Sequence, residues 1–128
     1  MSQQIKLPHY PMYIDGEFIK SSKIKLRSIN PHNGKPWATF ANSEPKEIER
    51  AIMAARQSLH QGEWTDMLPT ERGKLLFKLA DLIEEHAALI GEIETNDSGK
   101  LLAETATQTK YVADYYRYFA GLADKIEG

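Results

Sequence analysis

Apolar residues recur at helical spacing along much of the chain, and the strongest such pattern covers residues 70–100. Leucines and isoleucines stand three or four positions apart there, with charged residues between them, which predicts an amphipathic helix. We expect Thr70 to begin this helix, a break near His86, and residues 94–100 to close it, because Asn, Asp and Gly favour helix ends. The apolar stripe comprises Leu75, Leu76, Leu79, Leu82, Ile83, Leu89, Ile90 and Ile93.

Two more helices are predicted, one on each side of this stretch. Ser43 is suited to cap the first, Pro45 fits its first turn, and Gly62 ends it. A connector over residues 63–69 holds a tryptophan that can be buried, and the last helix covers residues 102–126. The positions expected on the packed faces are Ile48, Ile52, Ala55 and Leu59 in the first helix, and Ala106, Val112, Tyr116, Phe119 and Ala123 in the last.

The beginning of the chain favours strands. Asp15-Gly16 suits a two-residue type I′ turn, so residues 13–19 are predicted to form a β-hairpin. Residues 23–29 alternate between polar and apolar, which is typical of a strand with one buried face. An Asn-Pro pair and an Asn-Gly turn then lead to a further short strand over residues 37–41.

Composition narrows the classes of function. The chain has 128 residues and a formal net charge of −2, so it presents no overall basic field for nucleic acid. It contains no cysteine, which excludes disulfides, thiolate metal sites and a thiol nucleophile, and which suits a reducing compartment. Because it shows no signal-peptide core and no apolar run of about 18 residues, we expect a cytoplasmic protein without a membrane or nucleic-acid partner.

The central stretch also carries a family resemblance. ERGKLLFKLADLIEE, followed by ETNDSGK, resembles the N-terminal region of the aldehyde dehydrogenase superfamily, where an E/HRG-xLL-xx-LADLIE run ends in an E-T-x-D-x-G-K turn. INPHNGK upstream resembles the family's N-P-x-T-G-E turn, and RYFAGLADK downstream resembles its R-Y-Y/F-A-G-x-A-D-K segment. The resemblance is specific in order and spacing, and it covers residues 12–128 but only the first part of a family member.

The resemblance implies a fragment of an α/β fold. It would hold an N-terminal β-hairpin and short strands followed by three to four amphipathic helices, without the main parallel strands of the Rossmann-like nucleotide-binding sheet. Residues 12–128 would be the N-terminal part of a cofactor-binding domain, and residues 1–11 a flexible arm. Each uncovered Leu or Ile forgoes about 1.5–3 kcal/mol of burial energy, so we expect the isolated chain either to self-associate or to be partly loose.

The resemblance also implies NAD(P)-dependent oxidation of an aldehyde to a carboxylate. In the family, a cysteine thiolate forms a thiohemiacetal, hydride passes to the nicotinamide, and a glutamate activates water. This chain has no cysteine, and none of its residues matches the family's phosphate loop or catalytic glutamate motif. We therefore assign no catalytic and no cofactor-binding residue, and we expect the chain alone to be inactive and not to bind NAD(P).

One site of the family does map onto the chain. Many members bind a monovalent cation through backbone carbonyls at the end of the second strand and through the aspartate of the E-T-x-D-x-G-K turn. The matching positions are Ser28, Ile29 and Asp97, whose oxygen ligands suit Na⁺ or K⁺. The alternative is that Asp97 caps the turn by accepting hydrogen bonds from nearby amides.

Other polar and aromatic residues are assigned structural roles. The histidines lack zinc-site spacing, the acidic residues alternate with lysine as on a solvated face, and the tyrosines have the helical spacing of a packing stripe rather than a stacking platform. The isolated serines are assigned to caps and turns. These sets are His9, His32, His60 and His86; Glu84, Glu85, Glu92 and Glu94; Tyr111, Tyr115, Tyr116 and Tyr118; and Ser43, Ser58 and Ser98.

Two functions therefore follow from the sequence. In the first, the chain is the N-terminal segment of an NAD(P)-dependent aldehyde dehydrogenase and needs the remainder of the enzyme for activity. In the second, it is a noncatalytic helical module that binds itself or a partner through exposed apolar stripes.

Overall fold

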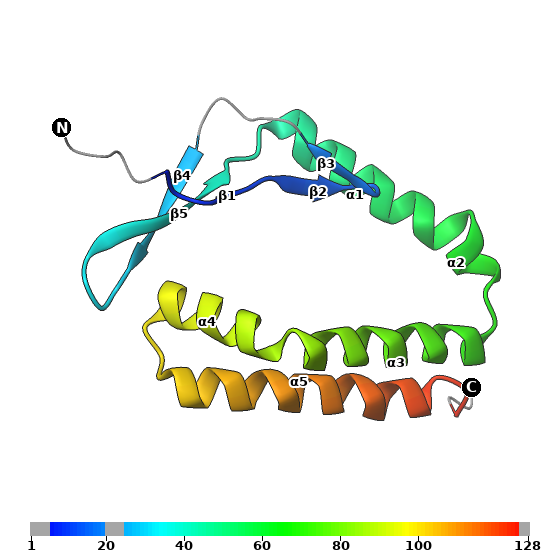
Figure 1. Ribbon diagram of the computed structural model, residues 1–128. Helices are drawn as coiled ribbons and strands as arrows, with labels where there is room; N and C mark the ends of the chain where they lie inside the picture. Colours follow the sequence, from blue (N-terminus) through cyan, green and yellow to red (C-terminus); the bar gives the residue numbers. More distant parts are fainter. Residues whose placement is uncertain (1–5, 20–24, 126–128) are drawn as a thin grey trace. The chain divides into compact units, whose positions relative to one another are not determined.

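The computed structural model of the protein describes residues 6–19 and 25–125. The chain divides into two compact units, Met1–Gly62 with the strands and one helix, and Glu63–Gly128 with the remaining helices (Figure 1). The predicted fold class, short strands followed by amphipathic helices without a large parallel sheet, is confirmed. Within the described part of the chain, no helix is long and apolar enough to cross a membrane.

The predicted N-terminal hairpin is confirmed. Strand β2 (Met12–Ile14) pairs antiparallel with β3 (Glu17–Ile19), and Tyr13 stands opposite Phe18 with 5.0 Å between ring centroids. The two loop residues, Asp15 and Gly16, have φ of 55° and 77°. A type I′ turn requires positive φ at both positions, which Asp tolerates and Gly adopts freely.

The second sheet has the strand order β1-β5-β4. Strand β4 (Lys25–Asn30) pairs antiparallel with β5 (Lys35–Ala41), and the Gly34 amide closes the turn by donating to the Asn30 carbonyl at 2.8 Å. Both predicted strands and the turn are confirmed, with residues 23 and 24 outside the described residues. The predicted buried face of β4 is wrong, because Leu26 is 41% exposed.

The segment predicted as an N-terminal arm, residues 1–11, contains a short strand that the sequence did not predict. Strand β1 (His9–Tyr10) pairs parallel with β5, and the Thr39 amide donates to the Pro8 carbonyl at 2.9 Å. A strand of two residues is too short to show an alternating pattern, and its partner lies about thirty residues further along the chain. The periodicity of the sequence therefore could not predict this strand. Residues 1–5 lie outside the described residues.

Helix α1 (Pro45–His60) confirms the first predicted helix but not its predicted cap. The cap position is Glu44, whose amide donates to the Glu47 Oε2 at 2.7 Å, so a carboxylate satisfies the helix start. Ser43 instead donates its hydroxyl to the Met12 sulfur at 3.2 Å. The apolar stripe of α1 is exposed at Ile48, Ile52 and Leu59.

The predicted connector contains a short helix, α2 (Glu63–Asp66), before α3 (Pro69–Glu85) begins one residue earlier than expected. Arg72 fixes this corner: its guanidinium donates to the carbonyls of Trp64 and Thr65 at 3.1 and 3.3 Å. The same guanidinium carbon lies 5.3 Å from the centre of the Trp64 ring, a cation–π geometry. Trp64 itself stays 44% exposed rather than buried.

The predicted break at His86 is confirmed, since α3 ends there and α4 (Ala87–Ser98) follows. The predicted closing turn over residues 94–100 is wrong for its first part, because α4 continues as a helix through Ser98. Only Gly99 is left-handed, with φ of 78°. Helix α5 (Leu102–Leu122) then confirms the last predicted helix, with residue 126 outside the described residues.

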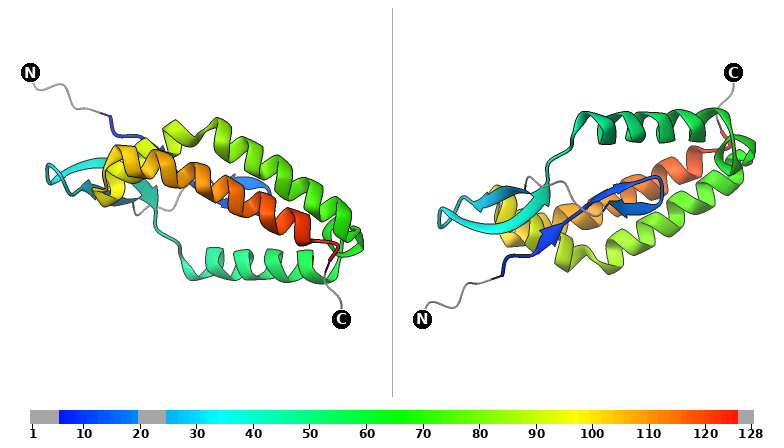
Figure 2. Two further views of the ribbon diagram at one scale, coloured as in Figure 1. Left: turned by 90° about the horizontal axis from the view of Figure 1, so that it is seen from below. Right: turned by 90° about the horizontal axis from the view of Figure 1, so that it is seen from above.

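Helix α5 packs along both α3 and α4, as the two views of Figure 2 agree. The predicted packed faces of these helices are only partly right. Leu79 and Leu82 are 40% and 45% exposed, and Val112 and Phe119 are exposed as well. Other predicted positions are half-buried where they were expected to pack, namely Leu76, Ile83, Ile93, Ala106, Tyr116 and Ala123. Of the four tyrosines, only Tyr116 is half-buried. The buried positions are small: Gly73, Ala80, Ala87 and Gly91 on one side, and Thr105, Thr109, Ala113 and Ala120 on the other. We call these eight residues the small-residue seam.

The seam exists because the helix backbones approach very closely. A Cβ atom built on Gly91 would lie 2.9 Å from the Ala106 backbone nitrogen, and one built on Gly73 would lie 2.8 Å from the Ala120 carbonyl oxygen. No side chain fits at such distances, so small residues occupy the contact and the leucines are displaced to the flanks. Periodicity marked the leucines because it weighs hydrophobicity and not size.

Gly91→Ala is expected to destabilise the helical unit by about 1–3 kcal/mol, because the added methyl group meets immovable backbone of α5. Gly121→Ala is the matched control. Gly121 lies in α5 with open space around its Cβ position, so alanine there is expected to stabilise the helix by up to about 1 kcal/mol. Urea denaturation of the full chain, followed by circular dichroism, measures both changes. Equal effects of the two substitutions would contradict the close helix approach.

Candidate functional site

The predicted cation-site residues belong to different units of the chain. Ser28 and Ile29 lie in β4 of the first unit, where the Ser28 hydroxyl accepts a hydrogen bond from the Trp37 indole at 2.9 Å. Asp97 lies in the last turn of α4, in the second unit. The joint binding of a cation by these residues therefore stays a prediction. Among the described residues, no group of three or more His, Cys, Asp or Glu is arranged to hold a metal ion.

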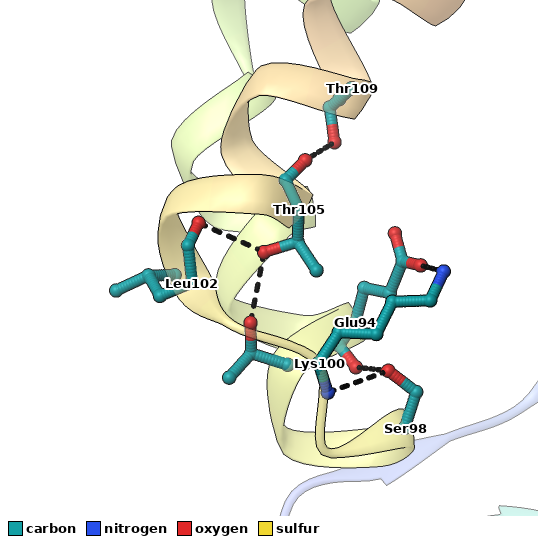
Figure 3. Close-up of polar contacts among 7 residues, drawn as sticks. Glu94, Ser98, Lys100, Leu102, Thr105 and Thr109 are labelled. Atoms are coloured by element: carbon teal, nitrogen blue, oxygen red, sulfur yellow. Dashed lines mark hydrogen bonds and ion pairs between the residues drawn. The ribbon is translucent and has the colours of Figure 1, made fainter.

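The corner between α4 and α5 is held by its own polar residues (Figure 3). The Gly99 amide donates to the Thr95 carbonyl at 2.9 Å, and the Ser98 hydroxyl donates to the Glu94 carbonyl at 2.7 Å. The Ser98 oxygen also accepts from the Lys100 amide at 3.3 Å, and the Lys100 ammonium pairs with the Glu94 carboxylate at 2.5 Å. The turn role predicted for Ser98 is confirmed, whereas Glu94 is ion-paired rather than simply solvated.

Threonine hydroxyls join the two helices just beyond this corner. The Thr105 side chain is fully buried, and its hydroxyl lies 2.9 Å from the Thr95 hydroxyl and 3.1 Å from the Leu102 carbonyl (Figure 3). A hydroxyl has one hydrogen, so Thr105 donates to Leu102 and accepts from Thr95. Thr109 repeats the arrangement by donating to the Thr105 carbonyl at 2.9 Å. The polar groups of this part of the seam are thereby paired.

Arg117 is the electrostatic link between α3 and α5. Its guanidinium lies 2.9 Å from the Asp81 carboxylate, 2.5 Å from that of Glu84 and 3.2 Å from that of Asp114. The hydrogen bond to Asp81, followed by that to Glu84, raises the pKa of Arg117 above its usual value. We call these four residues the Arg117 cluster. The sequence analysis assigned Glu84 to a solvated face and did not single out Arg117. Ion pairs between helices do not alter the periodicity of a sequence, so periodicity could not predict them.

The residues described so far can position backbone and bind ligands, but they do not supply a nucleophile. The chain contains no cysteine. A groove of about 360 Å³ runs along the helical unit and is lined by both apolar and polar side chains. Its lining residues are Ile83, Ile90, Glu94, Gln108, Thr109, Val112 and Tyr116.

Comparison with known proteins shows which family this chain belongs to. The sequence profile described as the aldehyde dehydrogenase family matches residues 18–128, which is most of the chain. The chain belongs to the aldehyde dehydrogenase family, and the resemblance seen in its sequence motifs is confirmed. At the level of the family, this is a class of NAD-dependent enzymes that oxidise aldehydes.

Among similar proteins, a (Z)-2-((N-methylformamido)methylene)-5-hydroxybutyrolactone dehydrogenase from Acinetobacter baylyi is 43% identical over 95% of this chain and 25% of its own length. Betaine aldehyde dehydrogenase from Bacillus subtilis is 39% identical over 91% of the chain and 24% of its length. The chain thus spans about a quarter of the length of these relatives.

Solved structures agree with the sequences. The NAD-dependent aldehyde dehydrogenase from Sinorhizobium meliloti superposes with a TM-score of 0.91 at 29% identity, over 96% of this chain and 25% of that one. Betaine aldehyde dehydrogenase from Staphylococcus aureus, solved in complex with NAD⁺, superposes with a TM-score of 0.86 at 38% identity, over 91% and 24% of the two chains. The N-terminal portion of the family fold is thereby shown.

Thr105→Val is expected to destabilise the helical unit by about 1–3 kcal/mol, because the Leu102 carbonyl loses the donor of the buried Thr105 side chain and the Thr95 hydroxyl loses its acceptor. Valine keeps the shape and the β-branching of threonine. Thr107→Val is the matched control, since the Thr107 hydroxyl is exposed and donates to the Ala103 carbonyl within the same helix. That change is expected to stay within about 0.5 kcal/mol. The midpoints of urea denaturation of the two variants measure both changes in stability. Equal midpoints would contradict the role of the Thr95–Thr105 pair.

Proposed function

We propose that this chain forms the N-terminal part of the cofactor-binding domain of an NAD(P)-dependent aldehyde dehydrogenase. The observation that carries the proposal is the superposition of nearly the whole chain on one quarter of an NAD-dependent enzyme, with a TM-score of 0.91. The reaction would convert an aldehyde to a carboxylate through a cysteine thiohemiacetal and hydride transfer to the nicotinamide. In this proposal, the thiol and the nucleotide site come from the remainder of the enzyme.

The role of this chain in such an enzyme is structural. The small-residue seam holds α3, α4 and α5 together while many of the large apolar side chains face outward. Leu75, Leu79 and Leu89 are 46%, 40% and 56% exposed. Side chains of this kind contribute to stability when they are covered, so the remainder of the enzyme is the natural partner of these faces. The absence of cysteine also supports a cytoplasmic location.

A monovalent cation is part of the same proposal. The carbonyls of Ser28 and Ile29 and the Asp97 carboxylate are hard oxygen ligands, which suit Na⁺ or K⁺. Asp97 lies in the last turn of α4, two residues before the left-handed Gly99.

The second candidate function is a noncatalytic module that binds itself or another protein. It is favoured by the exposed stripe of α1, where Ile48, Ile52 and Leu59 are 51%, 62% and 64% exposed. Exposed apolar faces of this extent mark interaction surfaces in soluble proteins. Both candidates use these faces, but only the first predicts activity after assembly.

A chimera tests the enzyme proposal directly. The segment of the Acinetobacter relative that matches this chain is replaced by the chain itself, and NADH formation is measured with a set of aldehydes. We expect the chimera to form NADH, the relative lacking its segment to form none, and this chain alone to form none, because it has no thiolate to attack the aldehyde. NADH formed by the chain alone, or a folded chimera that remains inactive, would contradict the proposal.

Sedimentation velocity tests the exposed faces. We expect the isolated chain to associate more strongly as its concentration rises, because the leucines of α3 are uncovered. Leu79→Lys combined with Leu82→Lys is expected to reduce this association. Ala88→Lys, which adds a charge at an exposed position of small size, is the control and is expected to leave it unchanged. A monodisperse monomer with a sharp, cooperative thermal transition would argue against uncovered faces.

A further inference from the structure

The loop between β4 and β5 (Figure 1) exposes an asparagine that is followed by a glycine. Asn33 and Gly34 are both exposed turn residues between the two strands. Gly34 has a φ of 67°, and no atom of the described residues lies within 4 Å of the position that its Cβ would occupy. The Asn33 side chain and the Gly34 backbone are therefore both accessible to water.

An asparagine followed by glycine can lose its side-chain amide by an intramolecular reaction. The Gly34 backbone nitrogen attacks Cγ of Asn33, which forms a new carbon–nitrogen bond and breaks the bond from Cγ to the side-chain nitrogen. That nitrogen leaves as ammonia and takes the proton of the Gly34 amide, and a cyclic succinimide remains. Water then opens the ring at either carbonyl carbon and leaves aspartate or isoaspartate. Glycine favours the attack, because it has no side chain to hinder the approach and its backbone rotates freely.

Two hydrogen bonds of the folded turn restrain this reaction. The Lys35 amide donates to the Asn33 Oδ1 at 2.9 Å, which holds the carboxamide in place. The Gly34 amide donates to the Asn30 carbonyl at 2.8 Å, so the proton that must be removed for the attack is engaged. Exposed bonds of this kind contribute little to stability, so the turn can open locally. The folded turn is therefore expected to slow the reaction without preventing it.

The other three asparagines of the chain lack this combination. Asn30 precedes a proline, whose nitrogen carries no proton and is already substituted. Asn42 is exposed, but it precedes a serine, whose side chain hinders the approach. Asn96 lies within α4, where the helix fixes the backbone. The N-P-x-T-G-E turn of the family has threonine where this chain has Asn33, so the reactive pair is a feature of this chain.

We propose that Asn33 is a site of spontaneous deamidation and that its isoaspartate product opens the β4–β5 turn. Isoaspartate lengthens the main chain by one carbon, because the chain then continues through the former side chain. The added length falls inside the loop that the hydrogen bond from Gly34 to Asn30 closes, and a negative charge appears at the same place. The pairing of Asn30 with Lys35, which adjoins the loop, is expected to loosen. This inference does not depend on the enzyme proposal.

A time course of the full chain tests the site. The chain is incubated in mildly alkaline buffer, which promotes loss of the amide proton, and its peptides are mapped by mass spectrometry for the exchange of an amide for a carboxyl group. Asn42 is the matched control within the same chain. We expect Asn33 to react at least about tenfold faster than Asn42, with isoaspartate detected by an isoaspartyl methyltransferase. Equal rates at the two positions, an unreactive Asn33, or aspartate as the sole product would overturn the proposal.

Gly34→Ala tests the attacking atom. The variant and the unaltered chain are both kept in urea, where the turn is open, so that strain in the folded variant does not affect the result. We expect alanine to slow the deamidation of Asn33 about tenfold, and an unchanged rate would exclude the Gly34 nitrogen as the nucleophile. For the unaltered chain, urea is expected to speed the reaction about tenfold by opening the two hydrogen bonds. No acceleration by urea would contradict restraint by the turn.

Hydrogen exchange of the modified chain tests the structural consequence. We expect the amides of β4 and β5 to exchange at least about tenfold faster once isoaspartate has formed, while those of the helical unit keep their rates. Asn33→Asp is the control, because it adds the charge without lengthening the main chain, and it is expected to keep the protection of the strands. If the chain with isoaspartate exchanges no faster than this control, the proposed opening of the turn is wrong.

Discussion

The architecture of the helical unit depends on how closely α5 approaches α3 and α4. Two glycines, Gly73 and Gly91, face the backbone of α5 at distances that leave no room for a Cβ atom. Alanines and threonines occupy the other contact positions of the seam. Dispersion attraction between closely spaced backbones replaces the usual burial of large side chains here. Many of the larger apolar residues are consequently directed to the outer faces, which explains the exposed leucines.

Polar interactions complete this arrangement where the helices meet and separate. At one end, the buried Thr105 joins the corner to the Thr95 hydroxyl and the Leu102 carbonyl. Further along, Arg117 connects α5 to Asp81 and Glu84 of α3. Both contacts are specific in direction, so they select one register of α5 against its partners. Packing of small residues alone would permit sliding, since a methyl group fits equally well at several positions along a smooth helix surface.

The sequence predicted those features that are encoded locally. Asp15-Gly16 specifies its own turn, and the break at His86 and the limits of most helices follow from nearby residues. The cap of α1 was misplaced by one position because the Glu47 carboxylate accepts from the amide of Glu44, so the helix start does not depend on a serine. The packed faces were misjudged because size, rather than hydrophobicity, decides them. Strand β1, the Arg117 cluster and the pairing of Thr95 with Thr105 arise from contacts between distant residues, and a single sequence carries no record of these. The cation set of Ser28, Ile29 and Asp97 rests on family resemblance alone.

The local character of the corner between α4 and α5 bears on how the chain acquires its structure. Thr95 and Thr105 are ten residues apart, so their contact closes a short loop, whereas β1 must find β5 about thirty residues away. Short loops close faster than long ones, and helical hairpins with nearby contacts assemble early. The helical unit can therefore form before the leucines on its outer faces are covered by other parts of a protein. Until those leucines are covered, such a folded helical unit would be prone to associate through them.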